Sequence, residues 1–236
     1  MTRMTDGART VSVIGAGRIG RAVIDFVGRA PGLRLGRVLS RSGLPDTADA
    51  DAFFTAPADL IIDTAGPGAL RAFGPRALGC TDLWTVGAAA LADDALRAGM
   101  EAAAVRAGHA LTLFTPWFAG IGHGLPHEVR GLHIRAERPG IGAPWSGALA
   151  DAVLQFPDDL NSAVAAALCG PGIAATTVEM SDSGPGGAHR IEARLVTGFA
   201  TFRSVAEFTG DPGASHPTAA AIIGALRRAG SALRQA

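Results

Sequence analysis

The chain has 236 residues, of which 48% are hydrophobic and 18% charged, and its formal net charge is zero. This composition is typical of a globular protein with one large or two small domains, and it excludes a disordered chain. The neutral balance argues against nucleic acid as the main partner. Neither Lys nor Tyr occurs, so a Schiff-base lysine and a Tyr–Lys reductase pair are excluded.

The two cysteines and the N-terminal segment point to an intracellular setting. Cys80 and Cys169 are far apart and fit no metal-ligand spacing, so we expect reduced, buried thiols. The opening "MTRMTDGART" has no apolar core of a signal peptide, and no apolar run approaches the roughly 20 residues of a membrane span. We therefore expect a cytoplasmic protein without a membrane partner.

A glycine motif near the N-terminus predicts dinucleotide binding. In "TVSVIGAGRIGRAVIDFVGRA" a β-branched strand ends at Gly15, and Gly15, Gly17 and Gly20 form G-x-G-x-x-G before a helical pattern. The first glycine permits the tight turn, the second lets the backbone approach a pyrophosphate, and the third allows close packing of helix and strand. The N-terminus of the helix then faces the phosphates.

The segments that follow alternate between strand and helix patterns. Strands are expected in "LRLGRVLS", "DLIIDTAG", "TDLWTVG" and "HALTLF", and helices in "GALRAFGPRALG", interrupted near Gly74 and Pro75, and in "LADDALRAGMEAAAVRAG". This order predicts a doubly wound parallel sheet with its ligand at the carboxyl ends of the strands. The residues expected to bind the cofactor on this frame are Gly15, Gly17, Arg18, Ile19, Gly20, Ser40, Arg41, Ser42, Ala65 and Gly87.

The end of the second strand indicates which cofactor is used. Enzymes that prefer NAD usually carry an acid there, which binds the ribose hydroxyls. This chain has Ser40, Arg41 and Ser42 instead. Hydroxyls and a guanidinium suit a 2′-phosphate, so the sequence favours NADP(H) and leaves NAD(H) open.

In the second half of the chain, the expected strands and helices no longer alternate. A strand is expected in "EVRGLHIRAE", helices in "SGALADAVLQF" and "LNSAVAAALCG", and then three strands in "IAATTVEMS", "HRIEARLV" and "FATFRSVAEF". Strands that follow one another through short turns predict an antiparallel meander. We therefore expect a Rossmann domain over 1–114, a smaller α+β domain with a mainly antiparallel sheet over 115–212, and a C-terminal helix over 213–236 that returns to the Rossmann domain. Ser215 is the expected cap of that helix.

Taken in order, the motifs resemble those of the L-aspartate dehydrogenase family. Besides the glycine motif, the resemblance rests on "TVGAAALAD", on "AVLQFPDDLNSAVAAALCG", on "HRIEARLVTGFATFR" and on "DPGASHPTAAAIIGAL". It implies a nicotinamide-dependent oxidation of L-aspartate to iminosuccinate, which hydrolyses to oxaloacetate and ammonia, in a homodimer. By position in the motifs, Ala119 and Asn161 are implied to contact the cofactor, and His189 to be the general acid and base.

The local sequence also makes His189 a candidate, independently of the family resemblance. It follows a glycine-rich turn and precedes an alternating strand, where a turn residue and a proton-transfer group are both reasonable interpretations. Its unperturbed pKa suits proton transfer near neutral pH, and with Lys and Tyr absent few other bases compete.

The chain departs from the family pattern at two places. The segment "TPWFAGIGHG" brings Trp117, Phe118 and His123 where the family has small residues, and Asp159 replaces an asparagine. Both departures concern the substrate, so another small amino acid or an imine is an alternative to aspartate.

Other functions remain open at this stage. His123, His127 and His133 with Glu128 are candidate metal ligands, although Pro126 argues against a helix there, and no metal site is expected. A different reductase on the same frame would lack its usual lysine. A non-catalytic, NADP-binding sensor is opposed only by His189 and Asn161.

Overall fold

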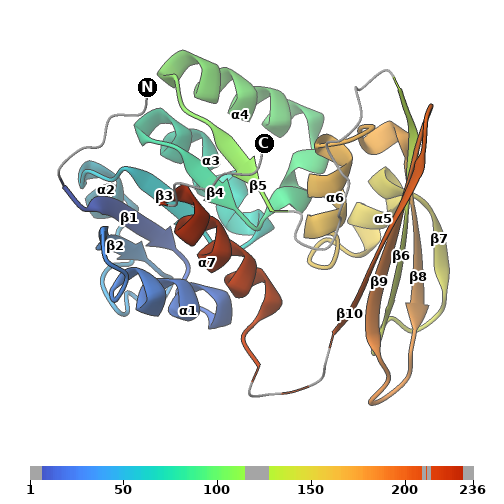
Figure 1. The fold of residues 1–236 in the computed structure, drawn as a ribbon. Helices are drawn as coiled ribbons and strands as arrows, with labels where there is room; N and C mark the ends of the chain where they lie inside the picture. Colours follow the sequence, from blue (N-terminus) through green and yellow to red (C-terminus); the bar gives the residue numbers. More distant parts are fainter. Residues whose placement is uncertain (1–6, 115–127, 209–210, 212–213, 231–236) are drawn as a thin grey trace. The chain divides into compact units, whose positions relative to one another are not determined.

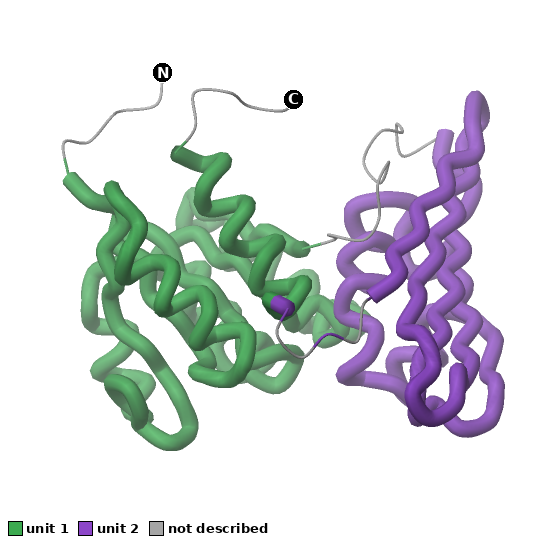
Figure 2. Tube along the Cα trace, turned by 60° about the horizontal axis from the view of Figure 1, so that its bottom comes forward, with its two compact units in different colours: residues 1–114, 215–236 green, residues 115–214 purple. Residues whose placement is uncertain are grey.

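The computed structural model describes residues 7–114, 128–208, 211 and 214–230. The chain divides into two compact units, 1–114 together with 215–236 and 115–214 (Figure 2). Each unit has its own five-stranded sheet (Figure 1).

The first unit is built on a parallel sheet with the strand order β2-β1-β3-β4-β5. Its strands are β1 (Arg9–Ile14), β2 (Leu33–Leu39), β3 (Leu60–Asp63), β4 (Leu83–Thr85) and β5 (Leu111–Leu113). The chain leaves β1 toward β2 and then crosses to β3 on the other side of β1. The carboxyl ends of β1 and β3 therefore form the switch point at which sheets of this kind bind ligands, and the predicted doubly wound fold is confirmed.

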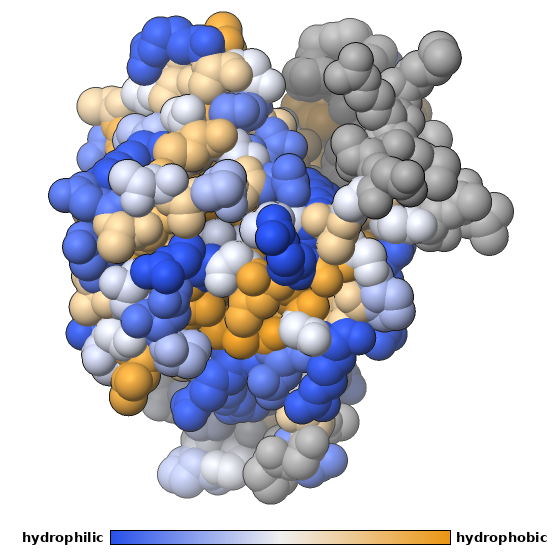
Figure 3. Space-filling view, turned by 90° about the vertical axis from the view of Figure 1, so that its left-hand side faces the viewer, coloured by the Kyte–Doolittle hydropathy of each residue, from blue (hydrophilic) through white to orange (hydrophobic). Residues whose placement is uncertain are grey.

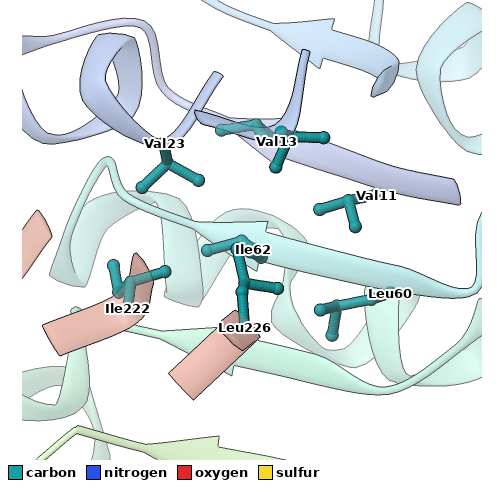
Figure 4. Packing of buried hydrophobic residues seen from close by; sticks show 8 residues of the cluster. Val11, Val13, Val23, Leu60, Ile62, Ile222 and Leu226 are labelled. Atoms are coloured by element: carbon teal, nitrogen blue, oxygen red, sulfur yellow. The ribbon is translucent and has the colours of Figure 1, made fainter. Parts of the chain in front are cut away.

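Helices cover both faces of this sheet. They are α1 (Arg18–Val27), α2 (Ala50–Thr55), α3 (Pro67–Cys80), the 3-10 turn η1 (Ala88–Ala92), α4 (Asp94–Ala107) and α7 (Pro217–Ala229). The C-terminal helix α7 packs beside α1, and its Ile222 and Leu226 lie against the strands (Figure 4). Each such side chain contributes about 1.5–3 kcal/mol by leaving water. The buried cluster comprises Val11, Val13, Val23, Val27, Leu60, Ile62, Ile222 and Leu226.

Two local predictions in the first unit are wrong. Helix α3 is not interrupted but continues through Pro75 to Cys80. A proline removes one hydrogen bond of the helix, yet α3 packs along α4 so closely that a Cβ on Gly74 would lie 2.6 Å from the Met100 sulfur. The cap of α7 is His216 rather than Ser215, because the His216 Nδ1 accepts the Thr218 N–H at 3.2 Å.

The second unit holds a mixed sheet with the order β10-β9-β6-β8-β7. The strands are β6 (Val129–Arg138), β7 (Trp145–Ala148), β8 (Thr176–Asp182), β9 (His189–Thr197) and β10 (Thr201–Phe208). The helices α5 (Leu149–Gln155) and α6 (Asn161–Leu168) cover one face (Figure 1), and the 3-10 turn η2 (Ile173–Ala175) precedes β8. The predicted mainly antiparallel sheet is confirmed, since only β6 and β8 pair in parallel.

The expected meander of three strands is corrected by this order. Of the three expected strands β8, β9 and β10, only β9 and β10 pair with each other, because β6 lies between β8 and β9 and pairs with both. Strand β6 is the longest of the sheet, and its alternate residues Leu132, Ile134 and Ala136 are buried. This row of buried side chains fits the central position of β6. Strand β7 was not expected.

The surface of the first unit mixes charged and apolar residues. On the side shown in Figure 3, apolar residues gather in the middle and hydrophilic ones surround them.

Both thiols, Cys80 in the first unit and Cys169 in the second, are free and exposed, which corrects the expectation of buried cysteines. Within the described residues, no helix is long and apolar enough to cross a membrane.

Candidate functional site

The glycine turn after β1 has the geometry that its sequence predicts. Gly15 has φ +99°, a conformation that side chains of L-residues rarely adopt. A Cβ on Gly20 would lie 2.0 Å from the Gly15 carbonyl oxygen, so helix α1 packs against the turn only because that side chain is missing. At Gly17 no atom lies within 4 Å of the place of a Cβ, so the backbone is open to a ligand.

The N-terminus of α1 suits an anion. Its cap is Gly17, no side chain accepts a hydrogen bond from its first turn, and that turn contains Arg18 and no acid. The helix dipole and the N–H groups of Arg18, Ile19 and Gly20 are therefore available to a phosphate group. These features fit the diphosphate of a nicotinamide dinucleotide.

Three loops meet at this edge of the sheet. The Thr64 hydroxyl donates to the carbonyl oxygens of Ile14 (3.0 Å) and Gly15 (3.1 Å), which ties the loop after β3 to the glycine turn. A Cβ on Gly15 would lie 2.9 Å from the Ala65 Cβ, and one on Gly87 would lie 2.6 Å from the Gly66 carbonyl carbon. The structure thus brings Gly15, Ala65 and Gly87, predicted separately, to one place.

A buried carboxylate links two of these loops. Asp63, 1% exposed, accepts hydrogen bonds from the Ala65 N–H (2.9 Å) and the Thr85 hydroxyl (2.7 Å), and the Thr85 oxygen accepts the Gly87 N–H at 2.9 Å. The bond to Ala65 ties the Asp63 side chain to the turn that follows β3. Burial raises the pKa of Asp63 to about 6, although the hydrogen bonds from Thr85, Ala65 and Gly66 oppose this change.

In the loop after β2, the serine hydroxyls make hydrogen bonds within the loop and the arginine is exposed. The Ser40 hydroxyl donates to the Leu44 carbonyl oxygen (2.7 Å) and lies 3.3 Å from the Ser42 hydroxyl. Arg41 is exposed. The next acids along the chain are already engaged, since Asp46 accepts the Val38 N–H (2.9 Å) and Asp49 caps α2. No acid of this loop is thus free to bind ribose hydroxyls.

In the second unit, His189 lies on the helix-covered face of the sheet, where β9 begins. Its ring packs on Phe208 of β10, with the centroids 4.5 Å apart. Burial lowers the pKa of His189, the positive charge of Arg138 lowers it further, and the Asp159 carboxylate raises it. The imidazole is therefore biased toward its neutral form, which is the form that accepts a proton.

Arg138 and Asp159 form an ion pair beside this histidine. The Nη2 atom of Arg138, at the end of β6, lies 2.7 Å from the Asp159 carboxylate, which precedes α6. Asn161 is the first residue of α6, and its side-chain amide donates to the Asp158 carbonyl oxygen at 3.2 Å. Ala119, Trp117, Phe118 and His123 lie outside the described residues.

The remaining histidines have other surroundings. His133 lies on the opposite face of the same sheet, where its Nδ1 is 2.8 Å from the Thr177 hydroxyl and its Nε2 is 3.3 Å from the Glu179 carboxylate. In the part of the chain that the structure describes, no three His, Cys, Asp or Glu side chains are grouped to hold a metal ion. His123 and His127 fall outside that part.

Sequence reasoning did not single out Arg138. An arginine at the end of an alternating strand is common and carries no signal of its own. Its position became informative only through the pairing of β6 with β9, which joins segments about 50 residues apart.

The comparisons with known proteins agree with one another. No family model matches the chain. The L-aspartate dehydrogenase of Ruegeria pomeroyi is 32% identical over 75% of this chain and 74% of that protein, and L-aspartate dehydrogenase 2 of Bordetella pertussis is 31% identical over 72% and 73%.

Solved structures show the same fold. The aspartate dehydrogenase of Thermotoga maritima matches with a TM-score of 0.79 over 97% of this chain and 99% of that chain, at 17% identity. GenD2 from gentamicin A biosynthesis, in complex with NAD, matches with a TM-score of 0.55 over 90% and 76%, at 13% identity. The chain has the fold of nicotinamide-dependent dehydrogenases and belongs to the L-aspartate dehydrogenase family.

Proposed function

We propose that this protein interconverts L-aspartate and iminosuccinate with NADP(H) as the preferred cofactor, and that His189 transfers the protons. Oxidation removes a hydride from Cα and a proton from the amine. Water then adds to the imine, and oxaloacetate and ammonia leave. We also propose that the enzyme is cytoplasmic and acts as a homodimer, and light scattering on the purified protein tests the dimer.

The environment of His189 is the observation that carries this proposal. A base for this reaction must be neutral at the working pH, held in place, and accessible to the substrate. The start of β9 and the Phe208 ring hold His189, and burial together with Arg138 lowers its pKa. In the direction of oxidation, the neutral imidazole accepts a proton from the water that attacks the imine. It then returns this proton to the departing ammonia.

The first unit supports the nucleotide part of the proposal. Gly15, Gly17 and Gly20 fit the diphosphate, and Ala65 and Gly87 line the same edge of the sheet. When bound, the nicotinamide accepts the hydride from Cα. Asn161 is proposed to contact the cofactor from the second unit, and Ala119 likewise.

The loop after β2 supports NADP(H). A 2′-phosphate requires donors and a positive charge. The exposed Arg41 offers the charge, and Ser42 offers a hydroxyl beside Ser40, whose own proton is donated to the Leu44 carbonyl oxygen. The neighbouring carboxylates, Asp46 and Asp49, have hydrogen-bond partners of their own.

Reductive amination of oxaloacetate with ammonia and NADPH, then NADH, tests substrate and cofactor together. The expected result is turnover with both and higher kcat/KM with NADPH. His189→Ala should lower turnover by about 10²–10⁴, and NADPH binding followed by fluorescence should stay nearly unchanged. His133→Ala is the matched control on the opposite face of the sheet. Full activity in His189→Ala contradicts the role of the histidine, and cofactor binding without turnover of any amino acid or imine favours a sensor.

A further inference from the structure

The guanidinium of Arg138 has an unused donor in a buried place. Three buried side-chain atoms among the described residues lack a hydrogen-bond partner, namely Arg37 Nε, Arg138 Nε and Ser183 Oγ. Arg37 Nε still lies 3.1 Å from the Asp46 carboxylate, so its charge is compensated. Asp159 lies 2.7 Å from Arg138 Nη2, and Arg138 Nε is left without an acceptor. A buried donor without a partner costs about 1–3 kcal/mol, so it calls for an explanation.

Arg138 and Ser183, which carry two of these unsatisfied atoms, are neighbours in the sheet. The Ser183 N–H donates to the Arg138 carbonyl oxygen at 3.2 Å, directly after the paired residues Arg138 and Asp182. Ser183 therefore joins the end of β8 to the end of β6. Two of the three unsatisfied buried atoms thus belong to residues that a backbone hydrogen bond joins, although these residues are 45 positions apart in the sequence.

Arg138 also lies next to His189 in the sheet. Strands β6 and β9 pair Glu137 with Arg190, and the next antiparallel position sets Arg138 opposite His189. Alternate residues of both strands face α5 and α6, and Arg138 and His189 are on that side. The charge of Arg138 also acts on His189 directly, since it lowers the pKa of that histidine.

We propose that Arg138, whose side chain is 33% exposed, binds a carboxylate of the substrate through its guanidinium, while Asp159 holds the guanidinium at Nη2 in the required orientation. The inference rests on the proposed function and names the anionic group that the site recognises. A guanidinium suits a carboxylate because its planar donors match the two carboxylate oxygens. Bound beside His189, an amino or oxo acid then has its reacting carbon close to the base.

Direct binding of an unreactive dicarboxylate tests this assignment without turnover. Succinate is titrated calorimetrically into the full-length protein with saturating NADP⁺. Arg138→Gln should raise the Kd of succinate about tenfold to a hundredfold, because a hydrogen bond to a charged group contributes about 1.5–3 kcal/mol. Arg138→Lys keeps the charge but loses the planar donors, so it should restore binding only in part.

Arg135→Gln is the matched control. Arg135 lies on the same strand with its side chain 56% exposed and paired with Glu179 on the opposite face, so its loss should leave the Kd of succinate unchanged. A Kd for Arg138→Gln within twofold of the wild type overturns the proposal. Wild-type protein that binds neither succinate, malate nor pyruvate overturns it as well.

A failure of this inference differs from a failure of the proposed function. If the wild-type protein binds succinate through Arg138 but does not aminate oxaloacetate, the carboxylate site is supported and the proposed reaction is wrong. Active enzyme with an unchanged Arg138→Gln retains the reaction and loses the site. Circular dichroism of each variant verifies that it is folded, and Arg138→Lys decides the question if Arg138→Gln does not fold.

Discussion

The buried carboxylate of Asp63 should make the stability of the protein depend on pH in an unusual direction. Its pKa rises from the ordinary 3.8 to about 6 in the folded protein because burial disfavours the charge. Between these two values the folded chain binds a proton that the unfolded chain has lost. The free energy of unfolding therefore falls as the pH rises through this window. At 1.36 kcal/mol per pH unit, the full effect is about 3 kcal/mol.

Asp63→Asn isolates this effect because asparagine has the same shape and no charge. The variant should gain stability relative to the wild type as the pH increases, with about 2 kcal/mol of the gain between pH 4.5 and 7.5. Other carboxylates titrate alike in both proteins and cancel in the difference. Urea unfolding measures it, with Trp84 on β4 as a fluorescent reporter of the first unit. Thr85→Val should move the window to higher pH, because the Thr85 hydroxyl stabilises the charged form. A difference that is the same at both pH values refutes the reasoning.

Three further predictions concern the cofactor and the base. Ser40→Asp should reverse the preference for NADPH over NADH in kcat/KM, since a carboxylate repels the 2′-phosphate and accepts ribose hydroxyls; a variant with the wild-type ratio contradicts the assignment. Gly20→Ala should abolish measurable NADPH binding and lower the melting temperature, because its Cβ would lie 2.0 Å from the Gly15 carbonyl oxygen, and Gly79→Ala, where the same atom meets nothing within 4 Å, is the control. Asp159→Asn should move the acid limb of the pH–rate profile to lower pH, because the Asp159 carboxylate raises the pKa of His189, whereas an unmoved limb means that another group is titrating.

The first unit could be predicted closely because its signals are local. The strands end at glycines or polar turns, and α1 and α3 follow β1 and β3 within a few residues, so the order of elements indicates a parallel sheet. Helix α2 was not expected. The prediction failed at Pro75, where packing of α3 against α4 outweighs the preference of a single residue. Local sequence contains no information on that contact.

The second unit was harder for a related reason. Its composition and turns indicated an α+β domain, but strand order depends on contacts between distant segments. The turn between β8 and β9 suggested a hairpin, whereas β6, far earlier in the chain, separates the two strands. Strand β6 buries Leu132, Ile134 and Ala136 along the middle of one face and pairs with β8 and β9 along its two edges. The alternation was visible in the sequence, and its consequence for the strand order was not.

The same limit applies to the candidate site. His189 could be predicted as the base from its motif, and its neighbours could not, because Arg138 and Asp159 come near it only through the pairing of β6 with β9 and the entry into α6. Asp159 was recorded as a departure from the family pattern without a physical meaning. In the structure its charge has two opposing effects, since it holds Arg138, whose charge lowers the pKa of His189, and itself raises that pKa. The negative charge of Asp159 therefore affects both the orientation of Arg138, the proposed carboxylate-binding group, and the pKa of His189, the proposed base. Variants of Arg138 and of Asp159, compared in succinate binding and in the pH–rate profile, separate these two effects.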